Sequence, residues 1–376
     1  MKKAKSNSPR KSAGYGNGIG MVAAVAFFLL LCRSDVAIEY MKKGLELCAR
    51  TVIPSLFPFM VISELMVSSG VGRRAISLFS KPMHALFGVS ENGAYAAILG
   101  AVCGFPIGTA VLCAMRDKGS ITERELSRVM TFCNNPGSAF VISAVGVSLF
   151  GSRRLGITLY ICVLLSAVTV GVVGRFFFGG GEESASASNP VTEGAVGPDL
   201  LACAVRRSAT AMLTVCAFVA FFSSFVGCIG SIVEKSGLSG AAVAAIFGFF
   251  EISGGVGMAA EAGNSSVAVL LCAWTLGWSG LSVHLQLMAL CGDRKVSFKP
   301  YFLAKAAQGI LCALYAGIAM RLPFLSEAVF APAARTYGFG RASAVACLFF
   351  AASVFPLALF CRFKVKKDAK SEDFEA

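Results

Sequence analysis

Apolar runs close in length to a membrane-spanning helix recur along the whole chain. The plainest are Gly20 to Cys32, Gly156 to Gly174, Leu200 to Gly230, Leu238 to Phe250, Ser266 to Trp278 and Ala342 to Phe360. A helix that crosses the hydrocarbon core of a bilayer needs about 20 consecutive, mostly apolar residues. Counting the short and interrupted runs as well, the chain holds about eight to ten membrane segments. The sequence therefore predicts an all-α, polytopic helical membrane protein.

The charged residues agree with this prediction. Only 15% of the 376 residues are charged, whereas a soluble domain is charged at about one residue in four. The net charge is +13, and basic residues gather before the first apolar run and in "RFKVKK", from Arg362 to Lys367. By the positive-inside rule both termini are cytoplasmic, which requires an even number of crossings. No soluble domain is long enough to bind nucleic acid, so the positive charge indicates topology.

The N-terminal apolar run resembles a signal peptide, but it ends in "LCRSDVAIEYMKK" without a small-x-small cleavage site. We interpret it as the first membrane helix. A stretch rich in Gly, Ser and Pro, from Gly179 to Asp199, reads as a flexible linker. The expected organisation is a basic tail (1–16), a first membrane repeat (17–178), the linker (179–199), a second membrane repeat (200–361) and a cytoplasmic tail (362–376).

Two pairs of similar motifs occupy corresponding places in the two halves. "GFPIGTAV" starts at Gly104 and "NNPGSAFV" at Asn134, 30 residues later. "GFFEISGG" starts at Gly248 and "GWSGLSVHLQ" at Gly277, 29 residues later. Many transporters consist of two inverted repeats that hold substrate between helices interrupted near the bilayer midplane. The matched order predicts two pseudo-symmetric repeats with broken helices.

Breaks of this kind are tolerated in a membrane only where the freed backbone groups line a cavity or are buried in protein. The residues expected to break the helices are Gly104, Pro106, Gly108, Pro136, Gly254 and Gly255. The amides of Asn134 and Asn135 offer hydrogen bonds, and Ser138 is expected to cap the half-helix that follows. The N-terminus of that half-helix would attract an anionic group. A capped loop at the membrane surface is the alternative.

The second half adds an acid. Glu251 follows an apolar run, where an unpaired carboxylate is costly, so it is predicted to bind a coupling ion, a proton or a polar substrate. A carboxylate at the membrane interface is the alternative. Ser282 and Gln286 would share one helix face, while His284 would point elsewhere. The predicted substrate-binding residues are Asn134, Asn135, Gly137, Ser138, Glu251, Ser253, Ser279, Gly280, Ser282 and Gln286.

The 14 cysteines form no CxxC pair, and the two histidines are far apart. These spacings predict neither a metal site nor a disulfide framework, and no cofactor is expected. The chain has no HExxH motif, no nucleophile elbow and no paired catalytic acids, so an enzyme is not expected either.

Taken together, the stretches "TVIPSLFPFMVISELMVSSG", "GFPIGTAVLCAMRDKGSITERELSRVMTFCNNPGSAFVI", "GFFEISGG" and "GWSGLSVHLQ" resemble the YlbJ-type sporulation integral membrane proteins. That family carries the nucleoside-recognition, or Gate, domain twice. The resemblance implies a protein of the outer forespore membrane that moves dipicolinic acid during sporulation. Gate domains also occur in concentrative nucleoside transporters.

The resulting expectation is a secondary transporter of a small organic anion, most readily dipicolinate, in a bacterial membrane. Its expected partners are that anion, the lipid bilayer and a coupling ion, and an oligomer is compatible with the sequence. A nucleoside or nucleobase carrier is the first alternative. The second is a non-transporting membrane factor for spore or envelope maturation.

Overall fold

The computed structural model describes residues 13–69, 79–177, 199–234, 239–261 and 266–321. Every regular element in these ranges is a helix, and they contain no β-strand. The prediction of an all-α polytopic membrane protein is confirmed. Residues 1–12 of the basic tail, residues 179–198 of the expected linker, the apolar run from Ala342 to Phe360 and the C-terminal tail lie outside the described residues.

The elements fall on either side of residues 178–198. Those before it are α1 (Ala13–Cys32), α2 (Ser34–Leu47), η1 (Cys48–Val52), α3 (Ile53–Ser69), α5 (Ser80–Phe87), α6 (Glu91–Cys103), α7 (Ile107–Asp117), α8 (Glu123–Cys133), η2 (Phe140–Leu149) and α9 (Arg153–Phe177). Those after it are α10 (Leu200–Glu234), α11 (Gly240–Phe250), α12 (Ile252–Glu261), α13 (Ser266–Trp278), α14 (Leu281–Cys291) and α15 (Phe298–Ala319). The segments η1 and η2 are π-helical.

Within the described residues, four stretches are long and apolar enough to span a membrane: α9, residues 200–233 of α10, the α13–α14 stretch and α15. Two bent helix pairs, within residues 34–66 and 80–103, raise the number to six if each counts as one span. The expected eight to ten segments included the run from Ala342 to Phe360, which lies outside the described residues, and short or interrupted runs. Several of the described helices are too short to span a bilayer alone. A helix of 11 residues, such as α7 or α11, is about 16 Å long and covers about half of the hydrocarbon core.

The two halves present their elements in the same order. In the first, α6 and α7 flank one break, α8 and η2 flank a second, and the long helix α9 follows. In the second, α11 and α12 flank one break, α13 and α14 flank a second, and the long helix α15 follows. The breaks therefore occupy equivalent places in each half, as the paired motifs predict.

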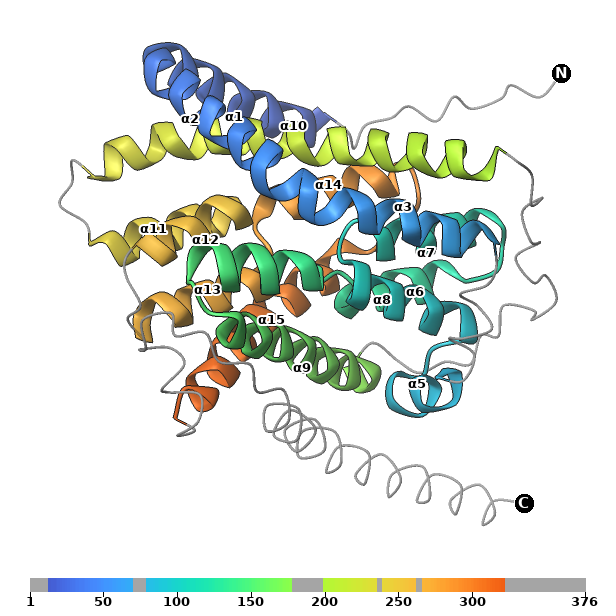
Figure 1. Ribbon diagram of the computed structural model, residues 1–376. Coiled ribbons are helices and arrows are strands. Elements are labelled where there is room, and N and C mark those ends of the chain that lie inside the picture. Colours follow the sequence, from blue (N-terminus) through green and yellow to red (C-terminus); the bar gives the residue numbers. More distant parts are fainter. Residues whose placement is uncertain (1–12, 70–78, 178–198, 235–238, 262–265, 322–376) are drawn as a thin grey trace, which may run out of the picture.

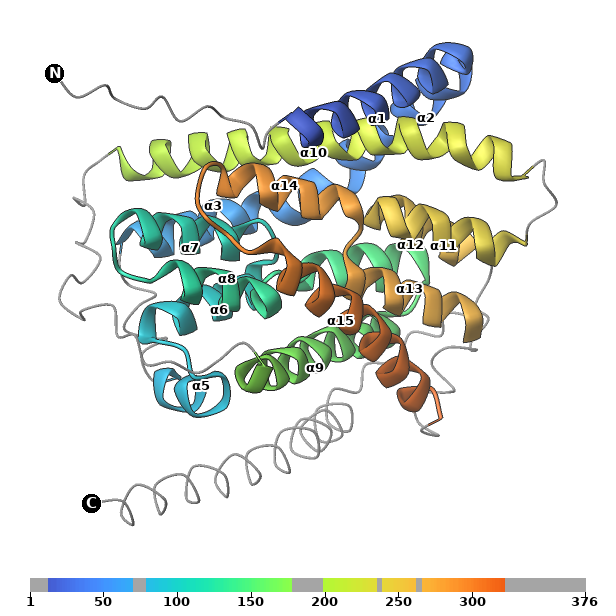
Figure 2. The same ribbon diagram turned by 180° about the vertical axis from the view of Figure 1, so that it is seen from behind.

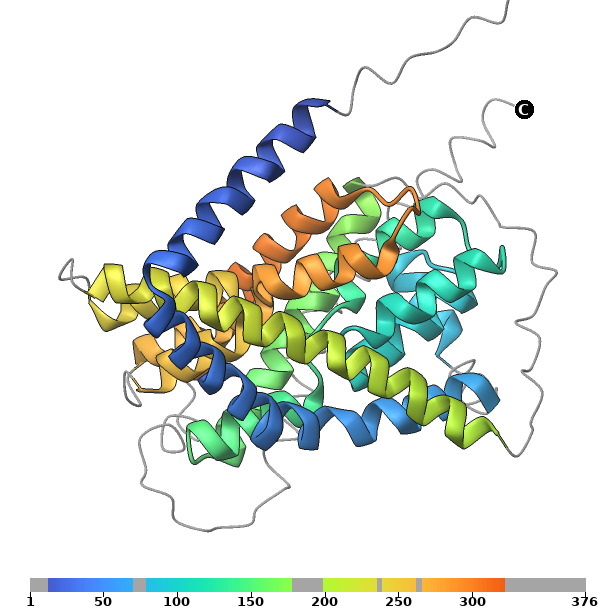
Figure 3. The same ribbon diagram turned by 90° about the horizontal axis from the view of Figure 1, so that it is seen from above.

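The long helices α9 and α10 lie on opposite sides of the short helices. Figure 1 shows α10 along one side of the molecule, packed beside α2 and α3, with α9 on the opposite side. Between these layers, α6, α7 and α8 lie towards one end and α11, α12 and α13 towards the other. Figure 2 shows α15 passing α13 and α9, against which it packs. Seen from above in Figure 3, α1 projects away from the other helices.

Helix α15 shows how the sequence separates lipid from core. Leu303, Ile310 and Leu314 are 70%, 58% and 56% exposed and recur at intervals of seven and four residues on one face. The opposite face carries Lys305 and Gln308, which are fully buried. The exposed apolar stripe fits a bilayer, and the buried polar pair points into the protein.

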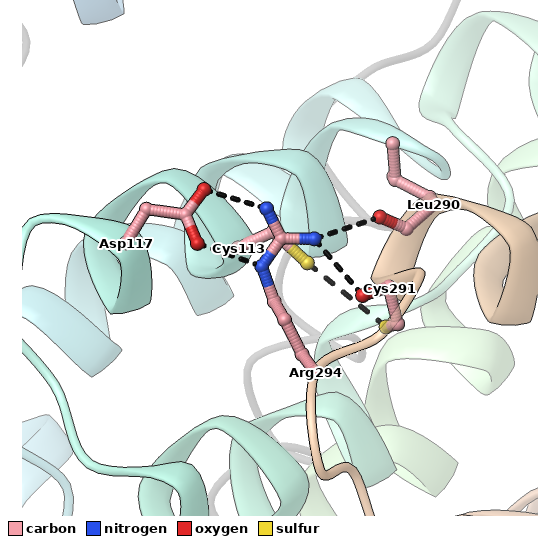
Figure 4. A network of polar contacts seen from close by, with 5 residues as sticks. All are labelled: Cys113, Asp117, Leu290, Cys291 and Arg294. Carbon is pink, nitrogen blue, oxygen red and sulfur yellow. Dashed lines mark hydrogen bonds and ion pairs between the residues drawn. The ribbon is translucent and has the colours of Figure 1, made fainter.

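The two halves are joined at one end by Arg294, which follows α14 (Figure 4). Its guanidinium donates to both carboxylate oxygens of Asp117, at the end of α7, at 2.9 and 2.5 Å. It also donates to the carbonyl oxygens of Leu290 and Cys291. The Arg294 guanidinium holds the pKa of the Asp117 carboxyl below its usual value. The pair therefore stabilises the fold at neutral pH, and that contribution is lost as the pH falls through the lowered pKa.

Candidate functional site

The two breaks of the first half contact each other through their backbones. Where α6 ends, the amide N–H of Phe105 donates to the carbonyl oxygen of Asn135 at 2.9 Å. Gly104 has a φ of +85°, and a Cβ built on it would lie 2.5 Å from the amide nitrogen of Gly137. A Cβ on Gly137 would lie 2.8 Å from the carbonyl oxygen of Cys103. Only glycine allows this approach, so the two glycines bring the breaks together.

The two breaks of the second half meet in the same way. After α11 the backbone is extended at Glu251, and after α13 both Ser279 and Gly280 have positive φ, at 77° and 81°. A Cβ on Gly280 would lie 2.9 Å from the amide nitrogen of Ile252. Ser279 is the one described non-glycine residue with positive φ. Such backbone strain costs on the order of 1 kcal/mol or more and clusters at functional sites.

Glu251 turns its carboxylate onto the start of α12. The side chain is buried, and its two oxygens accept the backbone N–H groups of Ser253 at 3.0 Å and Gly254 at 2.5 Å. These N–H groups belong to the first turn of the helix, where the dipole is positive. In the described part of the chain Glu251 forms no ion pair. The positive end of the α12 dipole therefore compensates the charge of the Glu251 carboxylate. No side-chain cation among the described residues does so.

A narrow cavity lies where the two pairs of breaks face each other. The first half lines it with Phe105, Pro136, Gly137 and Phe140, and the second with Glu251, Ile252, Ser253, Ser282, Val283 and Gln286. Val52, Leu56, Val215 and Val219 complete the wall. The space for the centre of a water-sized sphere is about 20 Å³, enough for about one water molecule. A molecule larger than water therefore requires the walls to separate.

The cavity has one apolar wall and one polar wall. The polar side chains on the second-half wall include two buried atoms without a hydrogen-bond partner among the described residues, Ser282 Oγ and Gln286 Oε1. Buried polar atoms in proteins almost always have partners. Both residues line the cavity on one face of α14, as their spacing predicts. These atoms are the ones best placed to bind a ligand.

Asn134 and Asn135 are buried, but their amides bond within the protein. Each amide nitrogen donates to a backbone carbonyl one turn earlier on α8. The Asn134 Oδ1 accepts from the Thr109 hydroxyl at 2.7 Å, and the Asn135 Oδ1 accepts from Gln308 Nε2 at 2.6 Å. Neither asparagine lines the cavity. They hold the first-half break in place, while Pro136 and Gly137 face the cavity.

Behind this break lies Lys305 of α15. Its Nζ donates to the carbonyl oxygen of Asn134 at 2.9 Å and to Gln308 Oε1 at 2.7 Å. Sequence reasoning missed both residues. The signal was available, because a lysine and a glutamine three residues apart share one face of an otherwise apolar helix. They tie a second-half helix to the first-half break.

Three predicted break residues lie inside helices instead. Gly108 is the second residue of α7, and Gly254 and Gly255 belong to α12. A Cβ on Gly108 would lie 3.0 Å from the Cα of Gly100, and one on Gly255 would lie 2.2 Å from the Cα of Gly248. Gly108 and Gly255 therefore serve close packing of the helices on either side of each break.

Three further side chains have contacts outside the cavity. Ser138 is already helical, so it does not cap the following half-helix, and its hydroxyl donates to the carbonyl oxygen of Val102 at 3.4 Å. His284 points away from the cavity, as predicted, and its Nδ1 lies 2.8 Å from the Tyr301 hydroxyl. The acid Glu64 forms an ion pair with Arg207 of α10 at 2.8 Å.

Comparison with known proteins finds a relative in sequence. No family model matches the chain. A solved structure of a CNTnw variant in the intermediate 2 state covers 83% of this chain and 87% of its own, at 16% identity and a TM-score of 0.43. The sporulation integral membrane protein YlbJ of Bacillus subtilis (strain 168) is 26% identical over 334 residues, which cover 79% of this chain and 82% of that protein. This similarity supports the assignment of the chain to the YlbJ-type sporulation integral membrane proteins, the family its motifs resemble.

Proposed function

We propose that this protein is a secondary transporter that carries a small, planar organic anion through the cavity between its two halves. The observation that carries the proposal is the convergence of helix breaks from both halves on one cavity, with Ser282 Oγ and Gln286 Oε1 unpaired at its wall. Broken helices that meet between two repeats are the usual place of a transporter's substrate. The related YlbJ protein is named for sporulation, so dipicolinate is the substrate we propose.

The chemistry of the two walls suits such a molecule. Phe105 and Phe140 offer aromatic surface on the first-half side, against which a planar ring packs well. Ser282 and Gln286 offer a hydroxyl and a carboxamide on the second-half side, and each can donate a hydrogen bond to a carboxylate. An apolar pocket with a few placed polar groups is typical of small-molecule sites.

In the proposed transporter, Glu251 couples the movement of substrate to the movement of a proton. A carboxylate in the cavity repels an organic anion, so we infer that Glu251 takes up a proton when substrate binds. Protonation weakens the interaction of Glu251 with the backbone N–H groups of Ser253 and Gly254, which donate to no other side chain in the described structure. Those donors then become available to a substrate carboxylate at the positive end of α12. Substrate and proton would therefore cross together.

The proposed location follows from the family and the charges. We place the protein in the outer forespore membrane with both termini in the cytoplasm. The two halves would alternate access by separating first on one side and then on the other. The narrow cavity of about 20 Å³ would have to widen in each of these openings to admit substrate.

A nucleoside or nucleobase carrier is the second candidate. Glu251 and Gln286 favour it, because a carboxylate and a carboxamide pair well with the N–H groups of a neutral base. A neutral base is not repelled by the Glu251 carboxylate, so its binding would not require protonation of Glu251. The two candidates therefore differ in the charge of the substrate.

Exchange across vesicles distinguishes them. Purified protein in vesicles loaded with unlabelled dipicolinate should take up labelled dipicolinate, and other aromatic dicarboxylates should compete while nucleosides should not. Ser282→Ala and Gln286→Ala should each raise the half-saturation concentration about tenfold, the effect of losing one hydrogen bond of about 1.4 kcal/mol. Ser148→Ala, an exposed hydroxyl on η2, is the matched control.

Each other outcome has a distinct meaning. Competition by nucleosides and not by dicarboxylates would overturn the anion proposal in favour of the second candidate. Exchange of neither class by folded protein would overturn both and favour a non-transporting membrane factor.

A further inference from the structure

A second and wider cavity lies between α8 and the segment that joins α14 to α15. It measures about 320 Å³ for the centre of a water-sized sphere, much more than the central cavity. The polar residues that line it are Glu123, Arg124, Ser127, Arg128, Thr131, Lys295 and Ser297. It is therefore large enough for a small organic molecule in the conformation that the structure shows.

The charge of this second cavity is mostly unneutralised. Arg124 and Lys295 are exposed, and within the described residues neither side chain forms an ion pair or a hydrogen bond. The carboxylate of Glu123 also lines the cavity, but it pairs with Arg116 at 3.1 Å. Like charges that share a cavity repel each other, and a bound anion removes that repulsion.

Arg128 adds a positioned guanidinium to the lining of the cavity. It is half-buried, and its Nη2 donates to the carbonyl oxygen of Gly88. Its Nε is buried and has no hydrogen-bond partner among the described residues. The neighbouring carboxylate of Glu125 accepts the backbone N–H of Ser90 at 2.7 Å. The guanidinium is thus oriented by one bond and retains a free donor, and guanidinium groups match carboxylate and phosphate oxygens.

From these observations we propose that the second cavity binds an oxyanion, a carboxylate or phosphate group, through Arg124, Arg128 and Lys295. Two sources carry this chemistry. One is a soluble anion from the aqueous phase, and the other is the headgroup of an anionic lipid. The proposal is separate from transport, because binding here requires no movement of the two halves.

The position of the second cavity relates it to the central site. Arg124 and Thr131 are seven residues apart on α8, about 10.5 Å along a helix, and the break at Asn134 is about 4.5 Å further. Helix α15 packs beside α8 and carries Lys305, which bonds the Asn134 carbonyl. The second cavity therefore lies on the same helix as the first-half break, and α15 contacts that helix.

Direct binding tests the proposal without measuring transport. Purified protein in lipid-free detergent is titrated with labelled dipicolinate and with inorganic phosphate. The double variant Arg124→Gln/Lys295→Gln should weaken binding about tenfold, because neither side chain has an internal partner whose loss would affect folding. Lys299→Gln, an exposed lysine outside the cavity, removes charge from the same end and should change binding less than twofold. Half-molar salt should weaken wild-type binding, since exposed charges are screened.

A second experiment tests whether the oxyanion is the headgroup of a lipid. Protein reconstituted in phosphatidylcholine vesicles with and without phosphatidylglycerol is re-extracted, and retained phosphatidylglycerol is measured. A loss of retained lipid in the double variant, with no binding of the soluble probes, assigns the oxyanion to a lipid. Equal behaviour of wild type, double variant and Lys299→Gln towards both kinds of probe would overturn the proposal. Tenfold weaker binding in the double variant, without any exchange by the wild type, would support this site and contradict the proposed transport.

Discussion

Glu251→Gln should abolish the accumulation of substrate driven by a pH gradient while leaving one-for-one exchange largely intact. Glutamine has nearly the shape of the protonated acid, and its carbonyl oxygen can still accept one of the two N–H groups that Glu251 binds. A side chain that is always neutral admits the anion but cannot release a proton. Uptake into vesicles is measured with and without an acid-outside gradient, and the wild type should concentrate label at least tenfold more than the variant.

The same helix supplies a control for this prediction. Glu261 is exposed at the end of α12, and Glu261→Gln removes the same charge without reaching the cavity. It should accumulate substrate as the wild type does. Accumulation by Glu251→Gln equal to that of the wild type would exclude Glu251 as the proton carrier, whether or not the protein transports the anion.

Gly104→Ala should cost about 3 kcal/mol of folding stability. About 1–3 kcal/mol comes from placing a Cβ on a residue with a φ of +85° and a ψ of 177°, a region that is essentially reserved for glycine. The remainder comes from overpacking, which typically costs 1–3 kcal/mol, because that Cβ would lie 2.5 Å from the amide nitrogen of Gly137. The backbone of the facing break cannot move aside without disturbing its bond from Phe105 to Asn135.

Gly119→Ala is a control for a positive φ without a close contact. Gly119 also has positive φ, at 69°, but a Cβ there would meet nothing within 4 Å. It should cost about 1 kcal/mol, from the backbone alone. Unfolding of the two variants in detergent is followed by helical circular dichroism. Equal losses for both variants would show that the two first-half breaks do not contact each other as closely as described.

The helix breaks could be predicted because their causes are local. Pro136 removes a backbone donor, and Gly104 permits a conformation that other residues avoid. Both act on the few residues around them, so the sequence shows them directly. The matched spacing of the four motifs then indicated that the breaks face each other across two halves, and Gly137 and Glu251 do line one cavity.

The roles of particular side chains could not be predicted from local pattern. Asn135 reads as a ligand-binding amide, but its partner is Gln308, 173 residues away. The orientation of an amide side chain depends on the hydrogen-bond partners that a distant helix brings next to it. Gly108 and Gly255 show a similar ambiguity, because glycine serves both a break and a close helix contact, and only the packing of Gly100 and Gly248 decides between them.

The basic second cavity illustrates the same limit. Arg124 and Arg128 lie on one face of α8, and the sequence gives that face the appearance of a solvated surface. Lys295 belongs to a segment more than 160 residues later, and only folding brings it to the same cavity. Charge patterns along one helix reveal which side is polar, but not whether a second segment encloses it.

Net uptake of labelled dipicolinate by vesicles that hold the purified protein tests the central claim most directly. Protein-free vesicles and vesicles with heat-unfolded protein serve as references, and an acid-outside gradient is imposed. We predict saturable uptake that the gradient accelerates and that unlabelled dipicolinate inhibits. Uptake indistinguishable from protein-free vesicles, with the protein shown to be folded by circular dichroism, would contradict the proposal that this protein carries dipicolinate.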